Sequence, residues 1–392
     1  MTDPPPRGKR PANRRELIRD AATELFASRG FEYVSMSDIA DAVAVRPSAL
    51  YRHFPGKEQL LGEIFARGVA DIGAALTRLD LRQGLDGLAE LAGFAIDNRA
   101  INALIRREMP HLPAAEHRAQ ATAMSQVAAV LAERIGRYRV ALRPQETIVL
   151  AWAVVSVLAS PAFHHVEVAR AEHSCQLAAA ARQVITAQLD GLGAAGGAAL
   201  PRPRALLLPI NRREALLARA VALFAERSYA RVSIEDIAAA CGMAGPSVYN
   251  YFAKKSDILL AALNRGSAYL AMQVSDGLAF ADDPAEALRA LIGSYLRFAF
   301  EHPALIDLLI SEVPSLPPAE QEAMRAAQRD YVAELVHLYG QAHPEASPVA
   351  ARIRVNAVLT IANDLARTGR LREQRGIVAR VTAVCEQALE LP

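Results

Sequence analysis

An internal repeat constrains this fold more than any other feature of the sequence. The stretch 35–57, SMSDIADAVAVRPSALYRHFPGK, returns 198 residues later at 233–255 as SIEDIAAACGMAGPSVYNYFAKK. Aligned without a gap from Pro11–Leu61 to Pro209–Leu259, about 20 of 51 positions are identical. A repeat of this length indicates that the chain contains two copies of one folding unit.

Each copy predicts two short helices joined by a tight turn. Ser35 and Asp38, like their counterparts in the second copy, have the S-x-x-D spacing of a hydroxyl that caps a helix with an acid in its first turn. Pro47 and Pro246 stand where the next helix begins, a position at which a missing N–H costs little. Apolar residues at i, i+4 and a polar opposite face complete the pattern of a helix-turn-helix, whose second helix enters the DNA major groove.

Candidate DNA-contacting residues lie on the expected outer face of that second helix and at the caps. Short or hydrogen-bonding side chains reach base edges there, and donors alongside hold phosphates. The first copy has arginines on this face and the second has none, so we expect the first copy to dominate DNA affinity. The alternative is a three-helix bundle that binds no DNA. The candidates are Ser35, Arg46, Pro47, Ser48, Ala49, Arg52 and His53, then Ser233, Ala244, Pro246, Ser247, Asn250, Tyr251 and Lys254.

Both copies resemble the DNA-binding unit of the TetR family of bacterial repressors. The resemblance implies that two tyrosine hydroxyls, of Tyr51 and Tyr249, meet DNA phosphate, and that Lys57 and Lys255 do likewise. The chain therefore looks like two TetR-type proteins joined end to end. The matching residues are Asp38-Ile39-Ala40, Leu50 to Lys57, Asp236-Ile237-Ala238, Val248 to Phe252, and Lys255.

Two turn positions depart from the family pattern. Ala44 stands where the family generally has glycine, and where the second copy keeps Gly242. A left-handed alanine there would cost roughly 1 kcal/mol relative to glycine. Ser228 likewise replaces the Gly30 that ends the first helix of the first copy. Neither change removes a predicted DNA contact.

The fold class follows from composition and periodicity. Among 392 residues 52% are apolar and few are aromatic, and no strand pattern occurs, so we expect an all-α fold. The predicted domains are a flexible basic arm (1–12), a first helix-turn-helix domain (13–61) with its regulatory bundle (62–189), a linker (190–208), and a second helix-turn-helix domain (209–260) with its bundle (261–392). Within the bundles, helices are expected at 145–160, from about 166 to 189, at 349–368 and at 371–389, among others.

The resemblance implies that each bundle binds a small-molecule effector and forms a dimerisation surface. For any single apolar residue in such a bundle, plain core packing is the more common role. The predicted linings are Phe94, Leu104, Trp152 and Phe163 in the first bundle and Tyr295, Phe298 and Leu309 in the second.

The remaining chemistry-bearing residues predict no catalytic or metal site. The sequence has no P-loop, no G-x-S-x-G, no H-E-x-x-H and no Gly-rich dinucleotide turn, so neither an enzyme nor a cofactor is expected. The cluster His164, His165, Glu167, His173 and Cys175 is interpreted as surface or interface side chains because its two-turn spacing does not suit a metal pair. A metal sensor is the alternative.

Charge, cysteines and hydropathy predict a cytoplasmic protein. A net charge of only +2 requires DNA contacts to come from local patches. The three cysteines form no C-x-x-C pair, which suits a reducing compartment. The N-terminus lacks a signal-peptide pattern, and the apolar run 148–159 is too short to span a bilayer, so no membrane partner is expected.

These observations favour a ligand-responsive repressor that binds double-stranded DNA. An architectural DNA-binding protein without a ligand is one alternative, and a helical scaffold or enzyme that retains the fold is another. The apolar helix 145–160 needs a partner, and 349–368 is its counterpart in the second half. We therefore expect the two halves to pair within one chain as a pseudo-dimer, in place of a homodimer of chains.

Overall fold

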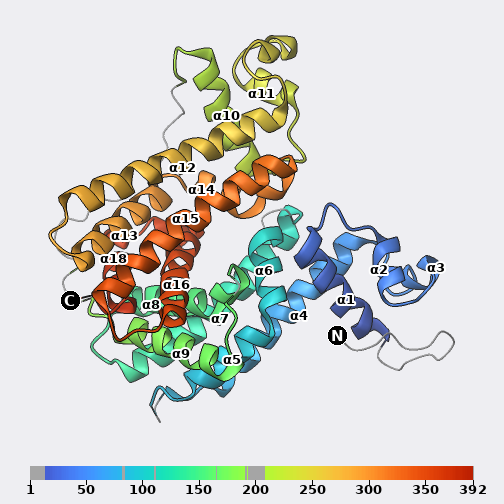
Figure 1. The fold of residues 1–392 in the computed structure, drawn as a ribbon. Coiled ribbons are helices and arrows are strands. Elements are labelled where there is room, and N and C mark those ends of the chain that lie inside the picture. Colours follow the sequence, from blue (N-terminus) through green and yellow to red (C-terminus); the bar gives the residue numbers. More distant parts are fainter. Residues whose placement is uncertain are drawn as a thin grey trace.

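The computed structural model describes residues 14–81, 84–109, 112–164, 166–189, 192 and 208–391. Over these ranges the chain forms helices and no strand, which confirms the all-α prediction (Figure 1). The predicted arm at 1–12 lies outside them, as does nearly all of the predicted linker at 190–208.

The two copies of the repeat fold into two three-helix heads, which project from the helical bundles as separate lobes in Figure 1. In each head the apolar i, i+4 residues are buried, Leu50 and Phe54 in the first and Val248 and Phe252 in the second. The first head contains α1 (Arg14–Arg29), α2 (Met36–Ala42) and α3 (Pro47–Leu50), and the second contains α10 (Arg212–Arg227), α11 (Ile234–Ala240) and the 3-10 helix η4 (Gly245–Asn250).

The first bundle follows its head through a long connecting helix. Its last helix begins at Arg170 and not near Val166 as predicted, because the chain after η3 runs through non-helical residues first. The elements are α4 (Lys57–Arg78), α5 (Leu88–Asp97), α6 (Arg99–Glu108), α7 (Ala114–Tyr138), α8 (Pro144–Ala159), η3 (Ser160–Ala162) and α9 (Arg170–Thr186).

The second bundle repeats this order with one further difference from the prediction. The single helix expected over 371–389 is interrupted, because Gly376 adopts a left-handed backbone with φ +68° and α18 begins only after it. The elements are α12 (Lys255–Phe280), α13 (Pro284–Glu301), α14 (Pro303–Ser311), η5 (Val313–Ser315), α15 (Pro318–Ala342), α16 (Pro348–Arg367), α17 (Gly369–Arg372) and α18 (Ile377–Ala388).

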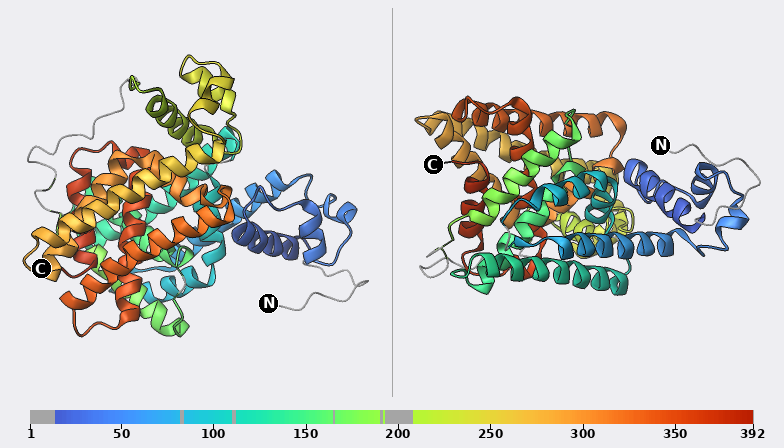
Figure 2. Two further views of the ribbon diagram at one scale, coloured as in Figure 1. Left: turned by 45° about the horizontal axis from the view of Figure 1, so that its top comes forward. Right: turned by 90° about the horizontal axis from the view of Figure 1, so that it is seen from below.

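The two bundles pack on each other through helices α8 and α9 of the first and α16 and α18 of the second. Figure 2 gives two further views of the bundles. The pairing of α8 with α16 is the one that the sequence predicts. Polar bonds cross the same interface: the Gln183 amide donates to Glu390 at 2.7 Å, and the Gln387 amide donates to Gln183 at 2.8 Å. One hydrophobic core runs through both bundles and into the first head.

The position of α8 between the two bundles explains why its sequence is apolar on nearly every side. With η3, α8 forms a 19-residue segment that is long and apolar enough to cross a membrane, but most of that segment is buried inside the protein. Burial of this kind is what a core helix between two bundles requires.

Candidate nucleic-acid interface and effector cavity

The first head presents the predicted contact face to solvent. Arg46, Pro47, Ser48, Tyr51 and Arg52 are exposed, while Ala49 and His53 beside them are half-buried. The guanidinium groups of Arg46 and Arg52 make no ion pair or hydrogen bond to any described residue. Two unpaired cations beside the exposed Tyr51 hydroxyl form a surface suited to a phosphate backbone.

The second head presents the same face with less positive charge. Ala244, Pro246, Tyr249, Asn250, Tyr251 and Lys254 are exposed, and Ser247 is half-buried. Its reading segment is a 3-10 helix, where the first head has one α-helical turn. Neutral residues stand at the positions of both first-head arginines.

Ser35 and Ser233 form the capping boxes that their spacing predicts. The Ser35 hydroxyl oxygen accepts from the Asp38 N–H at 3.1 Å, and the Ser35 N–H donates to the Asp38 carboxylate at 2.7 Å. Ser233 and Asp236 repeat this arrangement. The hydrogen bonds from Ser35 lower the pKa of Asp38, and those from Ser233 lower the pKa of Asp236. A DNA contact through either serine stays a prediction.

Lys57 and Lys255 have structural contacts that the sequence did not indicate. The Lys57 ammonium donates to the carbonyl oxygens of Phe31 (3.0 Å) and Val34 (3.5 Å) and lies 4.4 Å from the Phe31 ring centroid. Lys255 donates to Tyr229 and Val232 in the same way, at 2.9 Å each. Burial lowers the pKa of Lys255. These ammonium groups hold the loop between the first two helices, so their assignment to phosphate stays a prediction.

Both turn substitutions adopt the backbone that glycine would favour. Ala44 has φ +51° where Gly242 has φ +64°, and Ser228 has φ +68° where Gly30 has φ +92°. The left-handed alanine considered from the sequence is therefore present.

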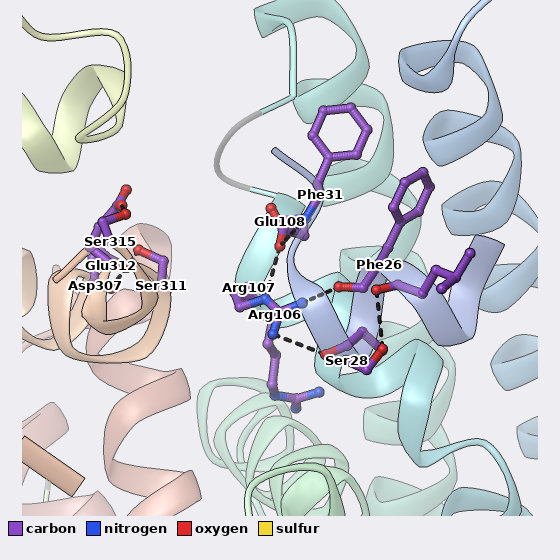
Figure 3. Close-up of polar contacts among 12 residues, drawn as sticks. Phe26, Ser28, Phe31, Arg106, Arg107, Glu108, Asp307, Ser311, Glu312 and Ser315 are labelled. Atoms are coloured by element: carbon purple, nitrogen blue, oxygen red, sulfur yellow. Dashed lines mark hydrogen bonds and ion pairs between the residues drawn. The ribbon is translucent and has the colours of Figure 1, made fainter. Parts of the chain in front are cut away.

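A polar junction between α6 and the first head was not predicted. Figure 3 shows Arg107 pointing toward the end of α1, where its guanidinium donates to the carbonyl oxygens of Phe26 and Ala27, the latter at 3.1 Å. The Phe31 N–H donates to the Glu108 carboxylate at 3.3 Å. In the second unit the Tyr229 N–H donates to Glu312 at 3.0 Å, but Ser311 stands where the first unit has Arg107. The only sequence signal for this junction is the repeated Glu-x-Pro-x-Leu-Pro segment. It points to Glu108 and Glu312 but gives no indication of Arg107.

A cavity of about 560 Å³ opens in the second bundle. It lies between α12, α13, α14, α15 and α16, and one residue of the first unit, Phe163, reaches its wall. The size suits a drug-sized molecule. The lining residues are Phe163, Ser267, Leu270, Ala271, Val274, Tyr295, Leu309, Ile310, Met324, Ala327, Gln328, Asp330, Tyr331, Val332, Glu334, Asn356, Leu359, Thr360, Asn363 and Asp364.

Two stacked tyrosines carry polar groups at this cavity. The rings of Tyr295 and Tyr331 lie 5.7 Å apart, centroid to centroid. The Tyr295 hydroxyl donates to Asn363 at 2.8 Å, and burial raises the pKa of Tyr295 to about 12. Burial also raises the pKa of Tyr331, whose hydroxyl has no hydrogen-bond partner among the described residues. Both groups are neutral donors at physiological pH.

The structure places the predicted lining residues in different surroundings. Tyr295 and Leu309 line the large cavity, whereas Phe298 is buried between Tyr269 and His302 as a core residue. Phe163 belongs to the second unit's cavity and not to the first's. In the first bundle Phe94 lines a space of only about 30 Å³, while Leu104 and Trp152 pack into the core. The space at Phe94 is too small for a drug-sized molecule.

The wall residue Asp364 forms a buried ion pair across the interface. Its carboxylate accepts from the Arg106 guanidinium of α6 at 2.6 and 2.9 Å, and the two side chains are 9% and 10% exposed. Arg367, one turn away, donates to the Arg106 carbonyl oxygen at 3.1 Å and to Asp307 of α14.

The histidine cluster is brought together only in part. The His164 and His173 rings lie 5.8 Å apart, while His165 is outside the described residues. Cys175 is exposed. Over the described part of the chain, no group of three or more potential metal-ligating side chains occurs.

Comparison with known proteins finds the same family signature in both copies of the repeat. The signature of the family described as "Bacterial regulatory proteins, tetR family" matches residues 18–64 and again 216–262, and a "Tetracyclin repressor-like, C-terminal domain" matches 281–367. The transcriptional repressor KstR2 of Rhodococcus jostii is 34% identical over 125 residues, which cover 30% of this chain and 60% of that protein. The regulator EthR of Mycobacterium tuberculosis is 36% identical over 100 residues, covering 24% and 44%.

Among solved structures, a regulator from Bordetella parapertussis aligns with a TM-score of 0.41 at 21% identity, covering 45% of this chain and 95% of that one. The matched stretch spans 60% or less of each of these two curated relatives.

Proposed function

The chain belongs to the TetR family of bacterial regulatory proteins, with two such units in tandem, and on that premise we propose that it is a sequence-specific DNA-binding transcriptional regulator. The observation that carries the proposal is the exposed contact face of the first head, where Arg46 and Arg52 are unpaired. Cations left without protein partners are available for phosphate or for a guanine edge. Regulators of this kind act in the cytoplasm, which we take as the compartment of this protein.

We further propose that the regulator is a repressor that releases DNA when a small molecule binds. The support is the cavity in the second bundle, which lies beside the helices that carry the second head. Ligand binding would favour one arrangement of the heads over another, a population shift whose size is set by the difference in affinity for the two arrangements.

DNA binding is tested by fluorescence anisotropy with a duplex from the region upstream of the protein's own coding sequence. We expect Arg52→Ala to weaken binding by about 1–3 kcal/mol if Arg52 reads a base, and by less if it meets only phosphate. Asn250→Ala should weaken it less, since the second head has fewer cations. Arg182→Ala, on α9, is a control of equal charge change.

Two results would contradict the proposal. If neither Arg46→Ala nor Arg52→Ala weakens binding more than Arg182→Ala, then the face is not a DNA contact and the chain is a scaffold that retains the fold. If Asn250→Ala weakens binding more than Arg52→Ala, the ranking of the two heads is wrong. DNA binding that no small molecule alters would indicate an architectural protein.

A further inference from the structure

The charges on the large cavity restrict what it can bind. Its lining includes three carboxylates, of Asp330, Glu334 and Asp364, and no lysine, arginine or histidine among the described lining residues. Arg106 neutralises Asp364 from outside the cavity, which leaves two acids on α15 with no cationic partner in the wall. An anionic ligand would lie beside like charges and lose its hydration without compensation.

The hydroxyl of Tyr331 is not accessible to a ligand in the cavity. It is buried and has no partner among the described residues, whereas the neighbouring Tyr295 hydroxyl already donates to Asn363. The hydroxyl groups of these two tyrosines therefore impose no requirement on the ligand. The rest of the wall is mostly aliphatic and aromatic, so the body of the ligand must be apolar.

We propose that this cavity binds an apolar molecule that is uncharged or cationic. The proposal rests on the effector-binding role proposed above and specifies its chemistry. The exposed Asp330 and the half-buried Glu334 disfavour anionic effectors such as fatty acids.

The test uses three probes of equal chain length, decanol, decylamine and decanoate, to displace the fluorescent dye Nile red from the full-length protein at pH 7. The dye should bind saturably, and Ala327→Trp or Val274→Trp, which fill the cavity, should abolish that binding. Decanol and decylammonium should displace the dye at concentrations at least tenfold below that of decanoate. The double variant with Asp330→Asn and Glu334→Gln should reduce the difference in displacing concentration between decanoate and the other two probes.

The proposal is overturned if decanoate competes as well as decanol, if dye binding is absent, or if dye binding survives both cavity-filling variants. DNA takes no part in this assay, so its result is independent of whether the chain binds DNA.

A second inference follows from the ion pair between Asp364 and Arg106, which joins the cavity of one unit to the other unit. Asp364 lines the cavity, and Arg106 lies on α6 of the first unit. The next residue, Arg107, holds the end of α1, and Glu108 binds the Phe31 N–H. One turn of α6 therefore contacts both the second unit's cavity wall and the first head, as Figure 3 shows for the head side.

The second unit lacks this arrangement. At the positions of Arg106 and Arg107 it has Ile310 and Ser311, and the Ser311 hydroxyl donates to the Asp307 carbonyl of its own helix. The hydrophobic cluster of the second head includes Leu308, Leu316 and Met324 of the second bundle, and it is separate from the core that continues into the first head. Charged links between the cavity and a head are thus concentrated on the first head.

We propose that occupancy of the second unit's cavity is transmitted across the interface to the first head, through Asp364, Arg106 and Arg107. The first unit would then serve mainly to bind DNA and the second mainly to sense the effector. This inference rests on the proposed function but has a readout without DNA, namely hydrogen exchange of the backbone amides at 26–31 and at the equivalent 224–229.

In the parent protein, saturating decanol should change exchange at 26–31 more than at 224–229. Arg106→Met combined with Asp364→Asn removes both charges at similar size. At a decanol concentration that saturates Nile red displacement in the same variant, it should reduce the decanol response at 26–31 at least fivefold. Arg170→Met with Asp97→Asn, an exposed pair within the first unit, is the control.

An equal response at both segments in the parent, or a full response in the double variant, would overturn the transmission route. The regulatory role itself is tested separately. It predicts that adding decanol reduces DNA binding, whereas the exchange experiment contains no DNA.

Discussion

At the scale of single residues, Ala44 shows how one side chain can strain a head without altering its contacts. The backbone there has φ +51°, close to the +64° of Gly242 at the equivalent turn. A left-handed alanine is less favourable than glycine because its Cβ approaches the following carbonyl. The first turn therefore keeps the shape of the second at a cost in stability.

We expect Ala44→Gly to stabilise the first head by up to about 1 kcal/mol, and Gly242→Ala to destabilise the second by a similar amount. Thermal or urea unfolding measures both. A midpoint that Ala44→Gly leaves unchanged or lowers would show that the turn has relaxed in solution to a different backbone.

His173 is the residue whose burial should make stability depend on pH. Burial, with a smaller contribution from Arg99, lowers the pKa of His173 below its usual 6.5, and the His164 ring packs against it. The folded state thus binds a proton less readily than the unfolded state. Stability is complete above about pH 6.5 and falls as pH drops through that value.

We therefore expect the free energy of unfolding to fall between pH 7 and 5.5, and His173→Asn to reduce that dependence. His337→Asn, on an exposed face of α15, is the matched control. If the two variants have the same pH profile, His173 does not carry the effect.

At the scale of helices, α6 contacts the first head through an arginine that α14 lacks. The Arg107 guanidinium donates to two carbonyl oxygens at the end of α1, where a cation also meets the negative end of the helix dipole. Ser311 has no comparable contact with the second head in the described structure.

Arg107→Met should therefore destabilise the first head by about 1–3 kcal/mol, the usual range for hydrogen bonds from a charged donor. Ser311→Ala should have little effect. Limited proteolysis within 26–34, or hydrogen exchange there, measures the change. Equal protection in the two variants would mean that apolar packing alone holds the heads.

Helix boundaries were predictable where a local signal defines them. The capping serines and Pro47 each mark a helix start found in the structure. The interruption at Gly376 was missed because a lone glycine within an apolar pattern does not reveal its backbone angle. The late start at Arg170 was missed because α9's apolar pattern extends into the preceding loop.

At the scale of the whole molecule, two similar units pack on each other within one chain. Helices α8 and α9 pack on α16 and α18, and the buried interface is continuous with both cores. Because the heads differ at Arg46/Ala244 and Arg52/Asn250, their half-sites should differ too.

We predict a monomer whose two heads reach successive major grooves about 34 Å apart on an imperfect palindrome. Light scattering on the purified protein gives the mass, and footprinting gives the two half-sites. A stable dimer of chains with four heads, or a fully symmetric operator, would contradict this prediction.

The sequence alone determined the features that local chemistry encodes. Two helix-turn-helix heads follow from a repeat with its caps, proline starts and i, i+4 apolar pairs, and the difference in charge between the heads is visible in Arg46 and Arg52. The apolar residues on nearly all sides of helix 145–160 also predicted that it is buried, and the repeat identified 349–368 as its partner.

Only the tertiary structure decided which bundle is hollow and which residues cross between the units. Leu104, Phe163 and Phe298 have the same apolar character in the sequence, yet the first and last pack into the core while Phe163 lines a cavity of the other unit. Arg106 and Asp364 are 258 residues apart, and no local pattern pairs them. Cavities and long-range ion pairs depend on how whole helices pack, and periodicity along one helix carries no information about the helix that faces it.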